Sequence, residues 1–214
     1  MKKFLRFVAT GYVFGIGVEI QYRLMGRFNP QALAAAIFLY PFILSFAWLG
    51  QKVIDKCVSR RLVADIACYF ACGISGLAIE WILLGNSPSA NPNAIQIGMF
   101  CMWATFCFGP RLLIRQDDST RRLRRRVWQF FGAYFALSTV IGLLIPAPQT
   151  RFVVIILVSV AAYIGINVLL LWLMIQQHRN ETTRRQVLDN DDEAMILAEI
   201  VQPADAGSAG GHNR

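Results

Sequence analysis

Two glutamates, Glu19 and Glu80, lie inside long apolar stretches of this 214-residue chain. An ionisable side chain in such surroundings is costly to bury, so it usually marks a binding site, a proton path or a fixed structural contact. Amide side chains follow the second glutamate and add further oxygen donors, which suit protons, hard cations or polar solutes. The candidate substrate- or ion-binding residues are Glu19, Glu80, Asn86, Asn93 and Gln96.

The two glutamates admit three interpretations. In the first, each carboxylate is structural and stabilises a turn by accepting hydrogen bonds at the start of the following helix. In the second, the carboxylates and amides form an outward-facing site for a solute or an ion. In the third, paired carboxylates act as acid and base on a lipid-linked substrate. The third is the least favoured, because the apolar stretches contain no histidine and no nucleophile–base pattern.

The five cysteines show no spacing typical of a metal site. Four of them, Cys68, Cys72, Cys101 and Cys107, fall in apolar stretches, where a thiol behaves as a small hydrophobic side chain. We therefore expect them to pack in the core, and we predict neither a metal nor a cofactor.

Five arginines form a second candidate site at the start of the fifth apolar stretch. Positive charge at a helix N-terminus opposes the helix dipole, so an external anionic partner must favour it there. The headgroups of anionic lipids are the expected partner, or else the chain's own acidic tail between Asp189 and Glu199. The cluster consists of Arg121, Arg122, Arg124, Arg125 and Arg126.

The elements that position these residues are long apolar segments. Hydrophobic residues make up 56% of the chain and charged residues 16%, well below the quarter or so expected of a soluble domain. Six segments approach or exceed the roughly 20 residues needed to cross a membrane as a helix. We predict an all-α integral membrane protein whose six transmembrane helices form three hairpins, at residues 4–24, 30–50, 62–85, 92–113, 127–146 and 152–175.

The distribution of positive charge predicts the orientation. With both termini in the cytoplasm, 18 of the 21 lysines and arginines fall on the cytoplasmic side. Only Arg23, Arg27 and Arg151 then lie outside, in agreement with the positive-inside rule. The net charge of +8 is thus explained by membrane topology, and nucleic acid is not an expected partner.

The first two hairpins share a sequence pattern. Gly15-x-x-x-Glu19 is followed by Asn29-Pro30, and Gly76-x-x-x-Glu80 is followed by Asn91-Pro92. Asparagine before proline is typical of an N-cap and first helical residue, so a new helix should begin at each pair. The pattern is consistent with a duplicated two-helix unit in parallel topology, which would bring the two glutamates to similar depth.

Residues 1–178 are thus predicted to be the transmembrane domain and residues 179–214 a cytoplasmic tail. In the tail, residues 189–201 have the pattern of a short acidic helix, and residues 203–214 have the composition of a disordered end.

The leading interpretation of function is a small permease-like or ion-coupled transport component in the bacterial cytoplasmic membrane. The alternative is a non-catalytic accessory or assembly subunit, with structural glutamates and an arginine cluster that binds anionic lipid or a partner. Besides the bilayer, the expected partners are further copies of the chain or another membrane subunit.

Overall fold

The computed structural model describes residues 1–24, 30–83, 85–89, 92–115 and 117–201, and this part of the chain contains helices and no strands. The all-α prediction is confirmed for these residues. The elements are α1 (Lys2–Leu24), α2 (Pro30–Cys57), α3 (Arg61–Leu83), α4 (Asn93–Cys107), α5 (Gly109–Leu113), the 3₁₀ helix η1 (Asp118–Thr120), α6 (Arg121–Leu144) and α7 (Pro148–Val201).

Among the described residues, four helical segments are long and apolar enough to cross a membrane: Ala36–Cys57, Arg61–Ile82, Asp118–Leu144 and Pro148–Arg184. Helix α4 is apolar but has only 15 residues, and α1 is not among the four. Large apolar side chains also lie on the outer faces of the bundle: Phe46 on α2 is 72% exposed and Leu143 on α6 is 76% exposed. The fold supports an integral membrane protein, while the count of six spans stays a prediction.

The fourth predicted segment, 92–113, is broken into two helices. Helix α4 ends at Cys107, and α5 begins at Gly109 with a proline in its first turn. Pro110 has no backbone N–H and its ring clashes with the preceding turn, so a straight helix cannot continue through it. The helix also begins at Asn93, one residue later than predicted, with Pro92 as its N-cap.

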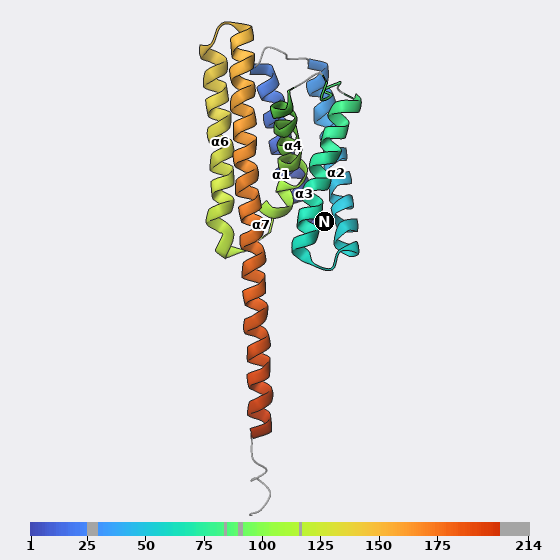
Figure 1. The fold of residues 1–214 in the computed structure, drawn as a ribbon, viewed down its shortest axis with the longest axis vertical. Coiled ribbons are helices and arrows are strands. Elements are labelled where there is room, and N and C mark those ends of the chain that lie inside the picture. Colours follow the sequence, from blue (N-terminus) through green and yellow to red (C-terminus); the bar gives the residue numbers. More distant parts are fainter. Residues whose placement is uncertain (25–29, 84, 90–91, 116, 202–214) are drawn as a thin grey trace, which may run out of the picture.

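The helices run alternately up and down along the long axis (Figure 1). The N-terminal end of α1, the turn between α2 and α3, and the start of α6 lie at one end, beyond which α7 continues. The ends of α1, α3 and α6 lie at the other. The order of three transmembrane hairpins and their orientation in a membrane stay predictions.

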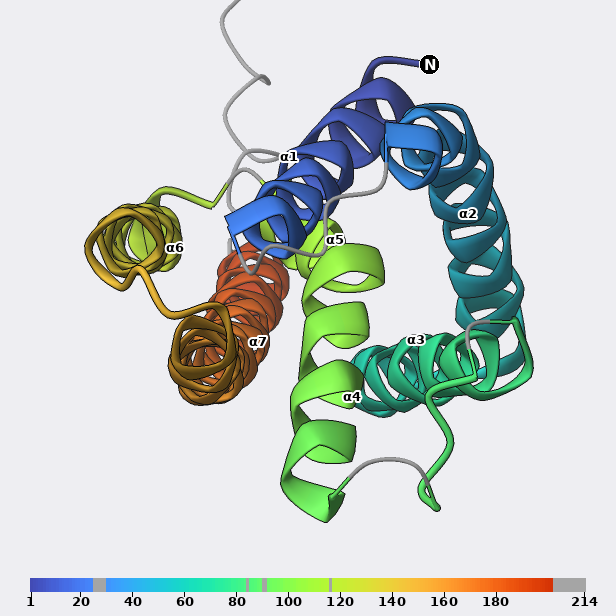
Figure 2. The same ribbon diagram turned by 90° about the horizontal axis from the view of Figure 1, so that it is seen from above.

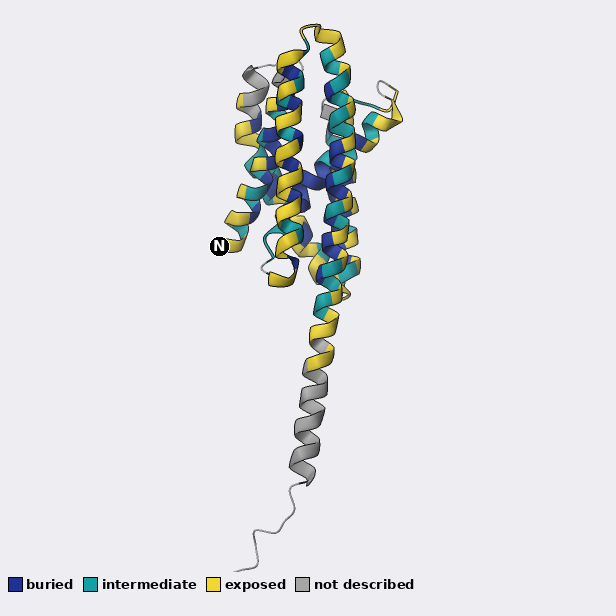
Figure 3. Ribbon diagram, turned by 90° about the vertical axis from the view of Figure 1, so that its left-hand side faces the viewer, coloured by how far each residue is buried: buried dark blue, intermediate teal, exposed yellow. Residues whose placement is uncertain are grey.

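Helix α4 lies at the centre of the bundle and contacts α1, α2, α3 and α7 (Figure 2). Its last two turns are buried almost completely, and Ala104 and Thr105 have no exposed surface. Figure 3 shows the buried residues gathered between the helices and the exposed ones on the outer faces.

Glycines allow the helices to approach closely around α4. A Cβ on Gly76 of α3 would lie 2.0 Å from the Trp103 ring, and one on Gly15 of α1 would lie 2.6 Å from the Tyr40 ring. Any larger side chain at these positions would force the ring or the helix to move, so both glycines are required by packing.

Helix α7 continues from the apolar bundle to Val201 without a break, and it includes residues 189–201, where we expected a short acidic helix. The predicted disordered end at residues 203–214 lies outside the described residues. The predicted caps Asn29 and Asn91 also lie outside them.

Candidate functional site

Glu80 lies near the C-terminal end of α3, where it is only 3% exposed. Its Oε1 accepts a hydrogen bond from the indole nitrogen of Trp103 at 3.0 Å, and its Oε2 accepts one from the amide of Asn86 at 2.7 Å. The backbone N–H of Asn86 also donates to the carbonyl of Glu80 at 2.9 Å. The carboxylate therefore fixes the start of the α3–α4 connection and ties it to the C-terminal half of α4.

Gln96 extends this set of contacts toward the surface. Its amide donates to the backbone carbonyl of Asn86 at 3.1 Å, and its Oε1 accepts from the indole nitrogen of Trp81 at 2.8 Å. The structure thus brings together Glu80, Asn86 and Gln96. Asn93 is exposed in the first turn of α4 and makes none of the side-chain hydrogen bonds found among the described residues.

Glu19 lies on α1 and is half-buried. Its Oε1 accepts a hydrogen bond from the hydroxyl of Tyr40 on α2 at 2.5 Å. Among the contacts of the described residues none joins Glu19 to Glu80, so a shared site for both carboxylates finds no support. An aromatic row lies between them instead: the Phe106 ring is 4.9 Å from the Tyr40 ring and 5.5 Å from the Trp103 ring, measured between centroids.

Both Gly-x-x-x-Glu motifs make the same contact. In each, the glycine lies under an aromatic ring of the next helix, and the polar hydrogen of that ring is donated to the glutamate. Tyr40 follows Glu19 by 21 residues and Trp103 follows Glu80 by 23. The sequence pattern thus has a physical counterpart, which supports the hypothesis of a duplicated hairpin.

The predicted arginine cluster at the start of α6 divides into two kinds of residue. Arg124 is half-buried and donates to the backbone carbonyls of Arg115 at 2.6 Å and Asp117 at 2.8 Å, so it caps the preceding loop. The other four cluster residues are exposed, and they take part in none of the ion pairs found among the described residues: Arg121, Arg122, Arg125 and Arg126.

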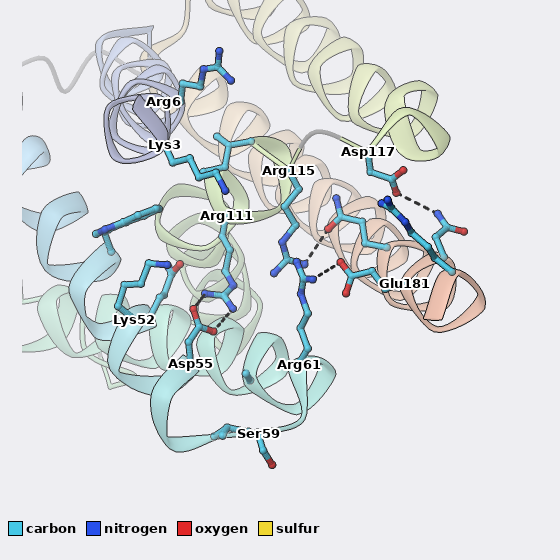
Figure 4. A pocket seen from close by; sticks show the side chains of 18 of the residues that line it. Lys3, Arg6, Lys52, Asp55, Ser59, Arg61, Arg111, Arg115, Asp117 and Glu181 are labelled. Atoms are coloured by element: carbon cyan, nitrogen blue, oxygen red, sulfur yellow. Dashed lines mark hydrogen bonds and ion pairs between the residues drawn. The ribbon is translucent and has the colours of Figure 1, made fainter. Parts of the chain in front are cut away.

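A large polar cavity of about 880 Å³ lies at the same end of the bundle (Figure 4). Side chains from α1, α2, α3, α5 and α7 line it, and none of them belongs to the arginine cluster. We call it the basic cavity, because seven basic and four acidic side chains line it. The basic ones are Lys3, Arg6, Lys52, Arg61, Arg111, Arg115 and Arg184, and the acidic ones are Asp55, Asp117, Asp118 and Glu181.

A network of ion pairs forms the floor of the basic cavity. Arg111 of α5 donates through both terminal nitrogens to Asp55 of α2, at 2.5 and 3.0 Å, and through Nε to Asp65 of α3 at 2.7 Å. Arg115 binds both oxygens of Asp65 at 2.7 and 2.8 Å and donates to Gln177 of α7 at 3.1 Å. Asp65 is only 2% exposed, so the network joins four helices through one buried carboxylate.

Four of the cavity's cations remain without an acidic partner. Lys3, Arg6, Lys52 and Arg184 are exposed, and they take part in none of the ion pairs seen in the described part of the chain. Lys52 lies over the Trp48 ring, 5.0 Å from its centroid. Figure 4 shows Lys3 and Lys52 beside Arg111, so positive charge from three helices gathers on one side of the cavity.

Asp117 closes another side of the cavity and joins the α5–α6 connection to α7. Its carboxylate accepts from the hydroxyl of Ser119 at 2.7 Å and from the amide of Asn180 at 3.3 Å. Burial raises the pKa of this carboxyl, but the hydrogen bonds from Ser119 and Asn180 and the charge of Arg124 outweigh it, so the pKa lies below its ordinary value.

The sequence prediction did not include the ion-pair network. In the sequence, Arg111 and Arg115 contribute only to the positive charge of the predicted cytoplasmic side, and no pattern pairs them with Asp55 or Asp65. Asp65 could have been noticed, since it is an acidic residue inside a predicted span. Its partners lie 46 and 50 residues away in the sequence, and only the fold brings them to Asp65.

In the described residues, no three histidine, cysteine, aspartate or glutamate side chains lie close enough together to hold a metal ion. The buried cysteines pack within the hydrophobic core.

Fold and site together define a class: an all-helical membrane protein with two bonded glutamates toward one end and a basic cavity at the other. Comparison of the chain with protein-family models, curated proteins and solved structures finds no match to any of them.

Proposed function

We propose that the protein is a non-catalytic component of the bacterial cytoplasmic membrane that binds an anionic, phosphate-like group in its basic cavity. The observation that carries this proposal is the set of four exposed cations without acidic partners around a cavity that already holds a fixed ion-pair floor. A phosphate group is the fitting ligand, because several of its oxygens can accept charge-assisted hydrogen bonds at once.

The ion-pair network at the floor of the basic cavity orients Arg111 before a ligand binds. Asp55 and Asp65 hold the guanidinium of Arg111 in one orientation, so a ligand need not order that side chain on binding. The long side chains of Lys3, Arg6, Lys52 and Arg184 can then close on the bound anion. Under the predicted topology this end faces the cytoplasm, where anionic headgroups give the membrane a negative surface.

The transport interpretation has less support. Glu80 is buried, and both of its carboxylate oxygens already accept hydrogen bonds from the protein. Polar groups deeper in the bundle bond to the protein as well: Asn167 donates to the carbonyls of Cys101 and Tyr163 and to the hydroxyl of Thr105. These contacts favour structural roles.

The test compares two pairs of substitutions that remove equal charge. Arg6→Gln with Lys52→Gln changes the basic cavity, and Arg125→Gln with Arg126→Gln changes exposed arginines outside it. Binding of phosphatidylglycerol and phosphatidylcholine to the purified full chain is measured by native mass spectrometry. A basic side chain near an anionic surface contributes about 1 kcal/mol, so the cavity pair should weaken phosphatidylglycerol binding by roughly tenfold or more.

The control pair should weaken it much less. An equal effect of both pairs would show general attraction by surface charge and would overturn the cavity as the site. Inorganic pyrophosphate is added in a second series. If it displaces phosphatidylglycerol from the wild-type chain, a soluble phosphate can occupy the same cations.

A further inference from the structure

A second, apolar cavity begins where the basic cavity ends. It has a volume of about 310 Å³ and runs between residues 43–54 of α2 and residues 68–79 of α3, with α4 at its base. Apart from Gln51 and Ser75, the side chains that line it are aliphatic, aromatic or cysteine, or the residue is glycine. We call it the apolar groove.

Gln51 marks the junction, because it lines both the basic cavity and the apolar groove. Its amide donates to the backbone carbonyl of Cys107 at 2.9 Å and to the thiol of Cys72 at 3.5 Å. The side chain is 3% exposed and so is held in place between α2, α3 and α4. The charged cavity and the apolar groove therefore adjoin at a fixed polar side chain.

The groove has the depth of one membrane leaflet. Eleven residues separate its two ends on α2 and also on α3, which corresponds to about 16 Å along each helix. Half of the hydrocarbon core of a bilayer is about 15 Å thick. The groove also begins at the predicted cytoplasmic interface, where the glycerol and headgroup of an inner-leaflet lipid lie.

Small residues keep the groove open. Gly50 lines it, and a Cβ at this position would have no atom within 4 Å. A narrow apolar groove of about 310 Å³ that runs along two helices suits a single extended hydrocarbon chain.

We propose that the ligand is a phosphate-bearing lipid whose headgroup lies in the basic cavity and whose acyl chain lies in the apolar groove. This inference rests on the proposed function of the basic cavity. The positive charge of the basic cavity favours a phosphate headgroup. Because Gln51 borders both cavities, the acyl chain of a lipid bound there lies next to the apolar groove. Since the bilayer is as apolar as the groove, the groove positions the chain mainly by close packing.

The inference is tested by photo-crosslinking on the full chain in phosphatidylcholine nanodiscs. The probe is phosphatidylglycerol with a diazirine in the middle of one acyl chain, and the labelled residues are mapped by mass spectrometry. We expect labelling of residues 43–54 and 68–79 at least fivefold above labelling of the exposed face of α6 near Gly132. Even labelling of both regions would overturn the inference.

Gly50→Leu is the groove variant, and Gly132→Leu is its matched control, because Gly132 also has open space around its missing Cβ. Gly50→Leu should reduce groove labelling at least fivefold, whereas Gly132→Leu should leave it unchanged. If the Leu variant fails to fold, the labelling map of the wild-type chain decides alone.

Failure of the inference and failure of the proposed function are distinguishable. If Arg6→Gln with Lys52→Gln abolishes the preference for phosphatidylglycerol but the groove is never labelled, the cavity binds the headgroup and the chain lies elsewhere. If that pair has no more effect than the Arg125/Arg126 control pair, both proposals fall. Crosslinks between two copies through α2 and α3, with no lipid label, would show that another chain covers the groove and would overturn the inference.

Discussion

At the scale of single residues, the fold holds two carboxylates, those of Glu19 and Glu80, by hydrogen bonds within an apolar bundle. A buried charge is tolerated where it is fully hydrogen-bonded. Glu80 obtains its donors from an indole and an amide, and Glu19 obtains one from a phenol. Aromatic donors suit this role, since their rings pack in the core while their polar hydrogen reaches the carboxylate.

The first prediction compares two tryptophans that each donate one indole hydrogen bond. Trp103→Phe leaves a buried carboxylate oxygen of Glu80 without its donor, and should lower the free energy of unfolding by about 2 kcal/mol. Trp81→Phe removes an exposed bond to Gln96 that water can replace, and should cost no more than about 0.5 kcal/mol. Unfolding in detergent measures both.

A double-mutant cycle with Glu80→Met, which removes both acceptor oxygens, separates the hydrogen bond from lost packing. Glu80→Gln alone should cost about 1 kcal/mol, because one acceptor oxygen remains. If Trp103→Phe costs the same in the wild-type and Glu80→Met backgrounds, the structural interpretation of Glu80 is wrong. A Glu80→Gln protein that folds normally but loses its cellular function would instead favour transport.

The second prediction concerns Asp65, which holds two arginines in the floor of the basic cavity. Asp65→Asn leaves Arg111 and Arg115 short of a buried negative charge, and should destabilise the protein by about 3 kcal/mol. Glu181→Gln is the control, since its ion pair with Arg61 lies at the surface and should contribute at most about 1 kcal/mol. Equal shifts in Tm for the two variants would contradict the prediction.

At the scale of elements, the connection between α5 and α6 is held by polar contacts. Asp117 accepts from Ser119 in its own loop and from Asn180 on α7, while Arg124 binds two backbone carbonyls of the same connection. One carboxylate thus joins the loop to the helix that leaves the bundle.

The third prediction follows from the lowered pKa of Asp117. A carboxyl with a lower pKa in the folded state stabilises the fold at pH values above its unfolded pKa of about 3.9. This contribution is lost as the pH falls through the folded value. Hydrogen exchange at residues 117–120 should therefore be slow at pH 7 and should accelerate below about pH 4 beyond the intrinsic chemical rate.

Asp117→Asn is the control for this pH dependence. The variant should exchange faster at pH 7 and show no further change between pH 5 and 3 after correction for the intrinsic rate. A wild-type loop whose protection is the same at pH 7 and pH 3 would show that the carboxylate does not hold it.

The positions of the helices could largely be predicted from the sequence, whereas most contacts between them could not. The apolar segments indicated helices at nearly the observed positions, because their composition and length dominate local structure. The break before Pro110 agrees with the poor fit of proline in a helix interior. Helix α2 continues through Pro41, however, so proline alone does not locate a break.

Asn86 was predicted beside Glu80, and it does bond to Glu80. Trp103 as a partner of Glu80, and Arg111 and Arg115 as partners of Asp65, could not be predicted, because these pairs are brought together only by the fold.

At the scale of the whole molecule, the two ends differ in chemistry. One end carries the basic cavity, to which α1, α2, α3, α5 and α7 all contribute. At the other end lie the turn beside Glu80 and the short connection between α6 and α7. The cavity can form in a membrane only if all five contributing segments reach the same side, so the site and the topology depend on each other.

The last prediction uses cysteines to test this dependence. Cys57 is exposed at the end of α2, beside the turn that lines the basic cavity, whereas the other four cysteines are buried. A membrane-impermeant maleimide should therefore label the wild-type protein only in permeabilised cells. Ser89 lies in the α3–α4 connection and is exposed. Ser89→Cys combined with Cys57→Ser should be labelled in intact cells.

The first helix is the critical part of this test, because it is not among the four helices long and apolar enough to span. Lys3→Cys in the Cys57→Ser background should also be labelled only after permeabilisation. Labelling of that variant in intact cells would place the start of α1 on the outer side. Lys3 and Arg6 could then not line the same cavity as Lys52 and Arg184, and the proposed headgroup site would lose the charges of α1.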